Sequence, residues 1–129
     1  MSTGHDGSLT TVHANTPRDA LSRLETMVLM SGMELPLRAI SEQISSAVNL
    51  IVQQTRFPDG TRRITHVSEV TGMEGDVISM QDIFLFEQSG YHQDGKVHGT
   101  LKPTGLIPQC FEDLRAQGIL VNLDMFQSN

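Results

Sequence analysis

The spacing of apolar residues predicts two helices in the first half of the chain. Between residues 17 and 31 apolar residues recur every three or four positions, which is typical of an amphipathic helix. Thr16 and Pro17 are typical of a helix start, and Gly32 of a helix end. A second helix is expected from Pro36 to about residue 48. The positions that set the two patterns are Ala20, Leu21, Leu24, Met27 and Val28, followed by Leu37, Ile40, Ile44, Ala47 and Val48.

From residue 50 onward the pattern is typical of strands. A compact apolar run at 50–52 predicts a buried strand, and residues 62–70 and 77–86 predict two more. Pro58 and Gly60 predict a tight turn over 57–61, and residues 72–75 are expected to connect the later pair. Such short connections are typical of an antiparallel meander. Residues 8–13, rich in β-branched side chains, predict a further short strand.

The last third of the chain is more polar. Residues 88–96 predict a loop or the tip of a hairpin. A final helix is expected over 107–117, with Phe111 and Leu114 facing inward and Gly118 at its end. The predicted order of elements therefore indicates a mixed α/β fold.

Composition narrows the class of protein only moderately. The 129 residues carry a formal net charge of -6, whereas proteins that bind duplex nucleic acid present a basic face. No nucleic-acid partner is therefore expected, although Arg62 and Arg63 could form a local basic patch. Cys110 is the only cysteine, which excludes an intrachain disulfide and fits a reducing compartment. No apolar run is long enough to span a bilayer, and the first residues lack the pattern of a signal peptide. We therefore expect a cytoplasmic protein.

The sequence contains none of the common catalytic signatures. It has no G-x-x-x-x-G-K-[ST] loop, no G-x-G-x-x-G, no G-x-S-x-G and no H-E-x-x-H or paired C-x-x-C. His5, Asp6 and His13 match no standard ligand spacing, so no metal site is expected. His5, His92 and His98 are interpreted as solvated loop residues, and His66 as a half-buried structural residue.

His13 differs from the other histidines by its position. It lies at the expected carboxyl end of a strand, directly before a capped helix. Ligands of α/β proteins gather at such ends, and a helix N-terminus offers free N–H groups to a phosphate. His13 therefore either contacts an anion or bonds a neighbouring backbone carbonyl, and its chemistry leaves both interpretations open.

Residues 3–17, which read TGHDGSLTTVHANTP, resemble the histidine box of type II/IV secretion ATPases. More narrowly, they resemble the CpaF-type ATPase of Flp (tight-adherence) pilus assembly. The resemblance continues through residues 18–27, 42–54 and 69–75, and in the tail through 103–108, 115–119 and Phe126. It covers nearly the whole chain as an ordered run of motifs.

The resemblance implies an α/β fold that is the C-terminal portion of a RecA-like P-loop NTPase domain, with an antiparallel β-meander and a C-terminal helix. Residues 1–87 would form that part, from the histidine box onward and without Walker A or Walker B. Residues 88–129 would form a C-terminal loop and helical extension. The missing motifs lie upstream in the family, so we expect either a natural protein that continues N-terminally or a truncated reading frame.

The resemblance also implies a function for the full-length parent. There, hydrolysis of ATP with Mg²⁺ would power pilin assembly or protein secretion. The parent would work as a cytoplasmic homohexamer, peripheral to the inner membrane, with inner-membrane platform proteins as partners. This chain alone is expected to be inactive and to bind no nucleotide tightly.

The same resemblance implies roles for individual residues. His13 corresponds to the histidine that faces the nucleotide phosphates. Thr11 and Ser8 belong to the same box and would support its strand and loop, while His5 and Asp6 would lie at the edge of the site. The chain holds no complete catalytic set.

Two other functions remain open. The chain could be a non-catalytic protein-interaction module of a secretion system. It could also be an unrelated small enzyme that uses His13 and Asp6 for acid–base work, which is the weakest reading because a general base needs an oriented partner. Arg18 and Arg23, on or near the first helix, are interpreted as solvated.

Overall fold

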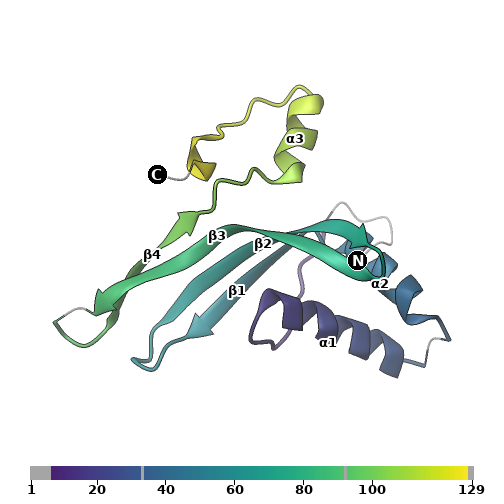
Figure 1. Cartoon of the computed structure of the whole chain (residues 1–129), viewed down its shortest axis with the longest axis horizontal. Helices are drawn as coiled ribbons and strands as arrows, with labels where there is room; N and C mark the ends of the chain where they lie inside the picture. The colour runs from purple at the N-terminus through teal and green to yellow at the C-terminus, as the bar shows by residue number, and fades with distance from the viewer. Residues whose placement is uncertain (1–6, 33, 92, 128–129) are drawn as a thin grey trace.

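The computed structural model describes residues 7–32, 34–91 and 93–127, and these form a mixed α/β fold (Figure 1). Two helices are followed by a four-stranded antiparallel sheet in the order β1-β2-β3-β4, and then by a short helical segment. The predicted mixed α/β class and the antiparallel meander are confirmed. The elements are α1 (Pro17–Met30), α2 (Leu37–Ala47), β1 (Leu50–Arg56), β2 (Arg62–Glu74), β3 (Val77–Tyr91), β4 (Val97–Pro103), α3 (Gln109–Ala116) and the 3-10 turn η1 (Asp124–Phe126).

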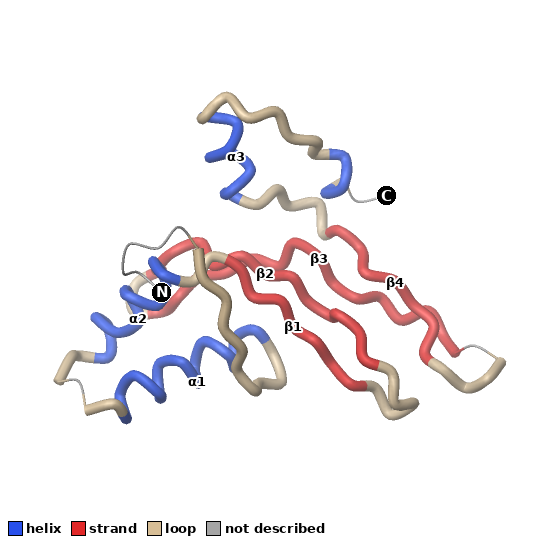
Figure 2. The backbone as a smooth tube through the Cα atoms, turned by 180° about the vertical axis from the view of Figure 1, so that it is seen from behind, coloured by secondary structure: helices blue, strands red, loops and turns tan. Residues whose placement is uncertain are grey.

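The main core lies between α1, α2 and one end of the sheet. In Figures 1 and 2, α1 lies below the sheet and the segment that contains α3 lies above it. Because successive residues of a strand point to opposite faces, Val70 of β2 packs on the helices while the neighbouring Glu69 points away from them. The buried residues of this core are Leu21, Ile40, Ile44, Val70 and Ile78.

Both helices predicted in the first half of the chain form, and the residues predicted to start the first of them do so. The Thr16 hydroxyl accepts a hydrogen bond from the Asp19 N–H at 3.0 Å, and Pro17 occupies the first turn of α1. Arg18 is not simply solvated as predicted, because its guanidinium donates to the Ile78 carbonyl of β3. This bond ties the start of α1 to the sheet.

The structure corrects the predicted connection between the two long strands. Residues 72–74 do not belong to the connection, because β2 continues through Glu74, and the chain turns at Gly75 and Asp76. Gly72 lies instead at an irregularity of the ladder between Val70 and Gly72, where its φ of +134° suits glycine best. The glycine that indicated a turn therefore bends the strand.

The strand predicted at residues 8–13 does not form, although the segment is described. These residues run without a ladder partner, so their β-branched composition produces no strand. Of the two predictions for residues 88–96, the hairpin is confirmed for the described residues, since β3 extends to Tyr91 and pairs with β4. The sequence did not predict β4. The boundary expected between residues 87 and 88 falls inside β3, and the division into 1–87 and 88–129 stays a prediction.

The far end of the sheet has a polar tie of its own. Asp59, in the turn between β1 and β2, accepts hydrogen bonds from the Thr61 hydroxyl and from the Val97 N–H of β4. Arg63 donates to the Val97 carbonyl at 2.9 Å and lies 5.8 Å from the centre of the Phe86 ring. Of the two arginines of the expected basic patch, Arg63 is therefore engaged inside the fold, and Arg62 is exposed.

We predict that Ile40→Ala lowers the free energy of unfolding by about 2–5 kcal/mol, because Ile40 is fully buried in the main core and its removal leaves a cavity. Leu37, on the same helix but 51% exposed, is the matched control, and Leu37→Ala should cost less than about 1 kcal/mol. Urea denaturation followed by circular dichroism measures both. Equal losses would contradict the position of the core.

We predict that Asp59 stabilises the fold near neutral pH and ceases to do so in acid. The Thr61 hydroxyl, helped by the N–H groups of Val97 and Thr61 and the charge of Arg63, lowers the pKa of Asp59 from 3.8 to about 2. A carboxyl with a lowered folded pKa stabilises above its unfolded pKa, and the effect is lost as the pH falls from 3.8 toward about 2. Asp59→Asn should therefore lower the Tm at neutral pH, with a difference from wild type that shrinks over that window.

The control for this experiment is Asp113→Asn, the same substitution at an exposed position of α3. Thermal melts of the three proteins across the acid range should show the convergence for Asp59→Asn alone. A Tm difference that stays constant down to about pH 2 would contradict the assigned role of the Asp59 charge.

Candidate functional site

A groove of about 820 Å³ lies between the N-terminal segment 7–14 and the edge strand β1. The start of α1 and the end of α2 close it from the sides. Within the described part of the chain, His13 is the only lining residue with an ionisable side chain. The lining residues are Gly7, Ser8, Leu9, Thr10, Thr11, Val12, His13, Ala14, Ala20, Leu24, Ser46, Ala47, Val48, Asn49, Leu50, Ile51, Val52, Gln53 and Gln54.

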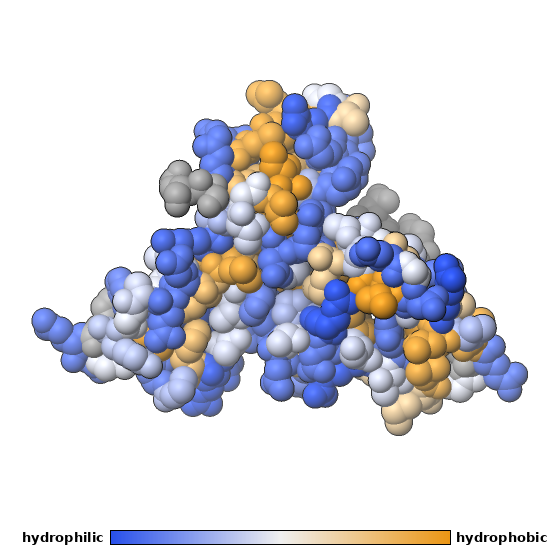
Figure 3. All heavy atoms as spheres, viewed as in Figure 1, coloured by the Kyte–Doolittle hydropathy of each residue, from blue (hydrophilic) through white to orange (hydrophobic). Residues whose placement is uncertain are grey.

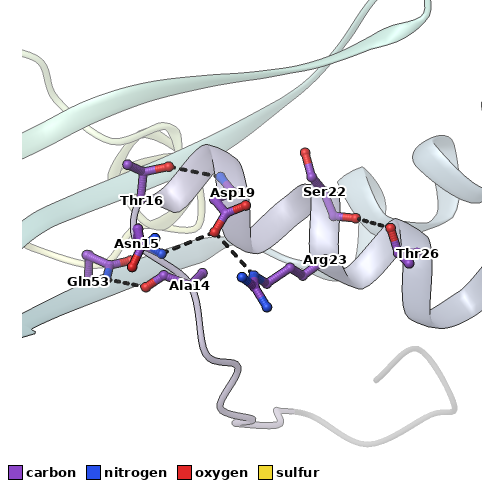
Figure 4. Close-up of polar contacts among 8 residues, drawn as sticks. All are labelled: Ala14, Asn15, Thr16, Asp19, Ser22, Arg23, Thr26 and Gln53. Carbon is purple, nitrogen blue, oxygen red and sulfur yellow. Dashed lines mark hydrogen bonds and ion pairs between the residues drawn. The ribbon is translucent and has the colours of Figure 1, made fainter.

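Gln53 of β1 holds the N-terminal segment in place. Its side chain is largely buried, with the residue 9% exposed, and its amide nitrogen donates to the Ala14 carbonyl at 2.9 Å (Figure 4). The register of β1 against β2 shifts between Gln53 and Gln54, so Gln53 occupies an irregular point of the ladder. Strand irregularities re-aim side chains, and here the side chain reaches the carbonyl that directly follows His13.

The turn after His13 is fixed from its other side by the start of α1. The Asp19 carboxylate accepts from the Asn15 N–H at 3.2 Å and from Arg23 at 3.2 Å (Figure 4). The Asn15 N–H, followed by Arg23, lowers the pKa of Asp19 below its ordinary value of 3.8. Asp19, three residues after the N-cap Thr16, therefore accepts a backbone N–H on the way into the helix, in a variant of the capping box.

The structure brings the described members of the predicted site together along one wall of the groove. Ser8, Thr11 and His13 all lie in the segment 7–14, and all three are exposed. Among the described residues the His13 ring makes no hydrogen bond to a backbone carbonyl, so that alternative interpretation of His13 is not realised there. His5 and Asp6, the other two predicted site residues, lie outside the described residues.

Of the other histidines that the sequence analysis interpreted, the structure describes His66 and His98, whereas His92 lies outside the described residues. His66 is half-buried in β2, with its Nδ1 atom 2.9 Å from the Thr65 hydroxyl, which confirms a structural role. His98 is exposed. Over residues 7–32, 34–91 and 93–127, no group of three or more His, Cys, Asp or Glu side chains is placed to hold a metal ion.

Gln53 is the residue of the groove that sequence reasoning missed. Its position between an apolar run and Gln54 gave no sign that its side chain is buried or that the ladder is irregular there. In chemical terms the groove offers hydroxyls, amides and one imidazole. It contains, in its described lining, neither a cation that could neutralise a phosphate nor a carboxylate that could orient a water molecule.

Comparison with known proteins places this groove within a known family. The family model described as "Type II/IV secretion system protein" matches residues 1–92, which include the whole N-terminal wall of the groove and β1. The chain belongs to this family. The match ends just beyond β3, so β4 and the segment with α3 lie outside it.

Individual relatives carry names from conjugal transfer. The conjugal transfer protein TrbB of Rhizobium radiobacter is 40% identical over 89 residues, which are 69% of this chain and 26% of TrbB. A Mycobacterium tuberculosis protein, whose assignment to conjugal transfer is itself provisional, is 31% identical over 77 residues, or 60% of this chain and 21% of its own length. The chain thus spans about a quarter or less of the length of these relatives. Separately, none of the helices in the described residues combines the length and apolar character needed to cross a membrane.

We predict that Gln53→Glu loosens the N-terminal segment, because a carboxylate cannot donate to the Ala14 carbonyl. Loss of one such hydrogen bond should raise the rate at which thermolysin cuts beside Leu9 and Val12 by about two- to tenfold. Gln54→Glu, at the exposed neighbouring position, is the matched control, and thermolysin should cut this variant at the wild-type rate. Equal cleavage in both variants would contradict the anchoring role of Gln53.

Proposed function

We propose that this chain is the histidine-box part of a secretion or pilus-assembly motor ATPase, and that it does not hydrolyse ATP alone. The observation that carries the proposal is the groove, whose wall is formed by residues that resemble the histidine box and whose one ionisable side chain, in the described lining, is His13. The family match over residues 1–92 supports the assignment. In the parent, ATP hydrolysis would drive protein secretion or pilin assembly.

In this proposal His13 faces the nucleotide phosphates, and Thr11 and Ser8 support the backbone on which it is carried. An imidazole can hydrogen-bond a phosphate oxygen, and its exposed position in the groove leaves it accessible to one. The same N-terminal wall also leads directly into the start of α1. His5 and Asp6 are assigned to the edge of the site from the resemblance alone.

The finer assignment extends the same proposal. We place the parent among CpaF-type ATPases of Flp pilus assembly, with a RecA-like nucleotide domain. It would assemble as a hexamer at the cytoplasmic side of the inner membrane, contact platform proteins there, and bind ATP with Mg²⁺. No nucleic-acid partner is assigned. The names of the relatives support a role in conjugal transfer, and the motif resemblance supports the pilus assignment.

The first test is phosphate release from ATP and Mg²⁺ by the purified chain, beside a His13→Ala variant. We expect no release above background from either protein, because the described groove lacks the cation and the carboxylate that phosphoryl transfer requires. Release that disappears in His13→Ala would mean that the chain contains a complete site, and the assignment as an inactive part would be wrong.

A second test gives a positive result under the proposal. The aligned region of the Rhizobium radiobacter TrbB protein is exchanged for this chain, and phosphate release is compared for native TrbB, the chimera, and the chimera with His13→Ala. The chimera should hydrolyse ATP, and His13→Ala should reduce the rate by about 100-fold, the usual scale for loss of a positioned polar group. A chimera that works equally well with His13→Ala would remove His13 from the site.

A further inference from the structure

Directly after β4, the chain is joined to the sheet by hydrogen bonds of a single residue, Thr104. The Thr104 N–H donates to the Ile83 carbonyl at 2.9 Å, and the Thr104 hydroxyl donates to the Asp82 carbonyl at 2.6 Å. Gly105 follows with a φ of +98°, a conformation in which glycine turns the chain without strain. We call residues 106–127, beyond this turn, the C-terminal cap. It stands above the sheet in Figures 1 and 2.

The first attachment of the cap is a buried carboxylate. Glu69 of β2 is 4% exposed and accepts hydrogen bonds from the backbone N–H groups of Gln109 at 2.8 Å and Cys110 at 3.2 Å, at the start of α3. The first N–H groups of a helix have no partner within the helix, and a negative charge beside them is favourable. Gln81 of β3 donates to the same carboxylate at 2.9 Å and orients it.

The second attachment is aromatic. Phe126 is 3% exposed, and its ring lies 5.8 Å from Phe84 of β3 and 4.9 Å from Phe111 of α3. Apart from Phe126 and Pro108 the cap has little interior, since α3 buries no residue and Leu120 is 98% exposed. Apolar residues are visible on its surface in Figure 3. The cap is therefore attached mainly at two small contacts.

We propose that the C-terminal cap opens as a unit about Gly105, without unfolding of the sheet, and that Glu69 is the clamp that keeps it closed. The sheet below is held by three antiparallel ladders and by the core with α1 and α2, whereas the cap is held mainly by Glu69 and the Phe84–Phe126–Phe111 cluster. Segments with so few buried contacts open with a lower free energy than the core. This inference is independent of the proposed ATPase function.

Opening changes the surface of the sheet on the face opposite α1 and α2. Cross-strand partners share a face, so Val52, Val67 and Phe84 form one row across β1, β2 and β3. Val52 is already 57% exposed, and Phe84 is the end of the row that the cap covers. An open cap thus extends an apolar row that is now only partly accessible, and uncovers the Glu69 carboxylate beside it.

The test is hydrogen–deuterium exchange of the full chain, read by mass spectrometry in peptides from residues 106–127 and from β2 and β3. In wild type the cap peptides should exchange faster than those of the sheet. Glu69→Gln keeps the shape of the side chain and removes its charge, and it should raise exchange in the cap about tenfold or more, since hydrogen bonds to a charged group are strong. Sheet peptides should keep the wild-type rate.

The control is Glu87→Gln, the same substitution on β3 at a residue that only pairs with Lys102 on the surface, and it should leave the cap at the wild-type rate. A Glu69→Gln variant that exchanges as wild type does would overturn the clamp. An increase of the same factor in the cap and in the sheet would overturn opening as a unit, because it would show global unfolding.

A second variant guards against general damage by Glu69→Gln. Phe126→Ala leaves Glu69 in place and weakens the aromatic attachment, and opening is read from alkylation of Cys110, the only thiol of the chain. Burial, and then the Glu69 charge, raise the pKa of the Cys110 thiol. Removal of Glu69 would therefore change the reactivity of the thiol by itself, and so the alkylation experiment uses Phe126→Ala. Alkylation should accelerate several-fold, and an unchanged rate would count against the cap as a detachable unit.

Discussion

Two consecutive residues of β2 determine how the layers of this protein are joined. Val70 points to one face of the sheet and packs into the core with α1 and α2, while Glu69 points to the other face and binds the start of α3. The alternation of a strand permits this division only in one register. A slip by one residue would place the carboxylate in the apolar core and leave the valine under the helix start. The pairing of β2 with both neighbours therefore fixes the positions of every helix.

The N-terminal groove also depends on the sheet, through an irregularity in the pairing of β1 with β2. β1 is an edge strand, and its ladder with β2 shifts at the point where Gln53 turns toward Ala14. The segment that carries His13 is therefore held where it enters α1, by the Gln53 side chain at Ala14 and by the Asp19 carboxylate at Asn15, and its described residues pair with no strand. Membership of the type II/IV secretion family covers this groove, and the C-terminal cap lies beyond the matched region.

The sequence predicted best those features that are decided by neighbouring residues. Thr16, Pro17 and the three- and four-residue spacing were enough for α1, and the turn at Pro58 and Gly60 was enough for the first hairpin. Features that need a distant partner were predicted poorly. Residues 8–13 have strand composition and no ladder, whereas β4 contains Gly99 and forms because β3 pairs with it.

The candidate site likewise contains residues that the sequence indicated and residues whose roles depend on distant partners. The motif resemblance indicated Ser8, Thr11 and His13, and the structure places all three on one wall of a groove. Gln53 could not be predicted, because its role arises from a ladder irregularity and from contact with a residue 39 positions earlier in the chain. The clamp at Glu69 is equally non-local, since its partners follow 40 and 41 positions later.

The tie between the first turn and β4 has a consequence for the order in which the chain folds. The three hairpins of the meander join neighbours in sequence, so each can form as soon as its own turn has closed. The bond from Asp59 to Val97 closes a loop of 38 positions and needs β2, β3 and β4 already in place. Folding would then proceed by early local hairpins and finish when the turn at Asp59 is fastened to the last strand.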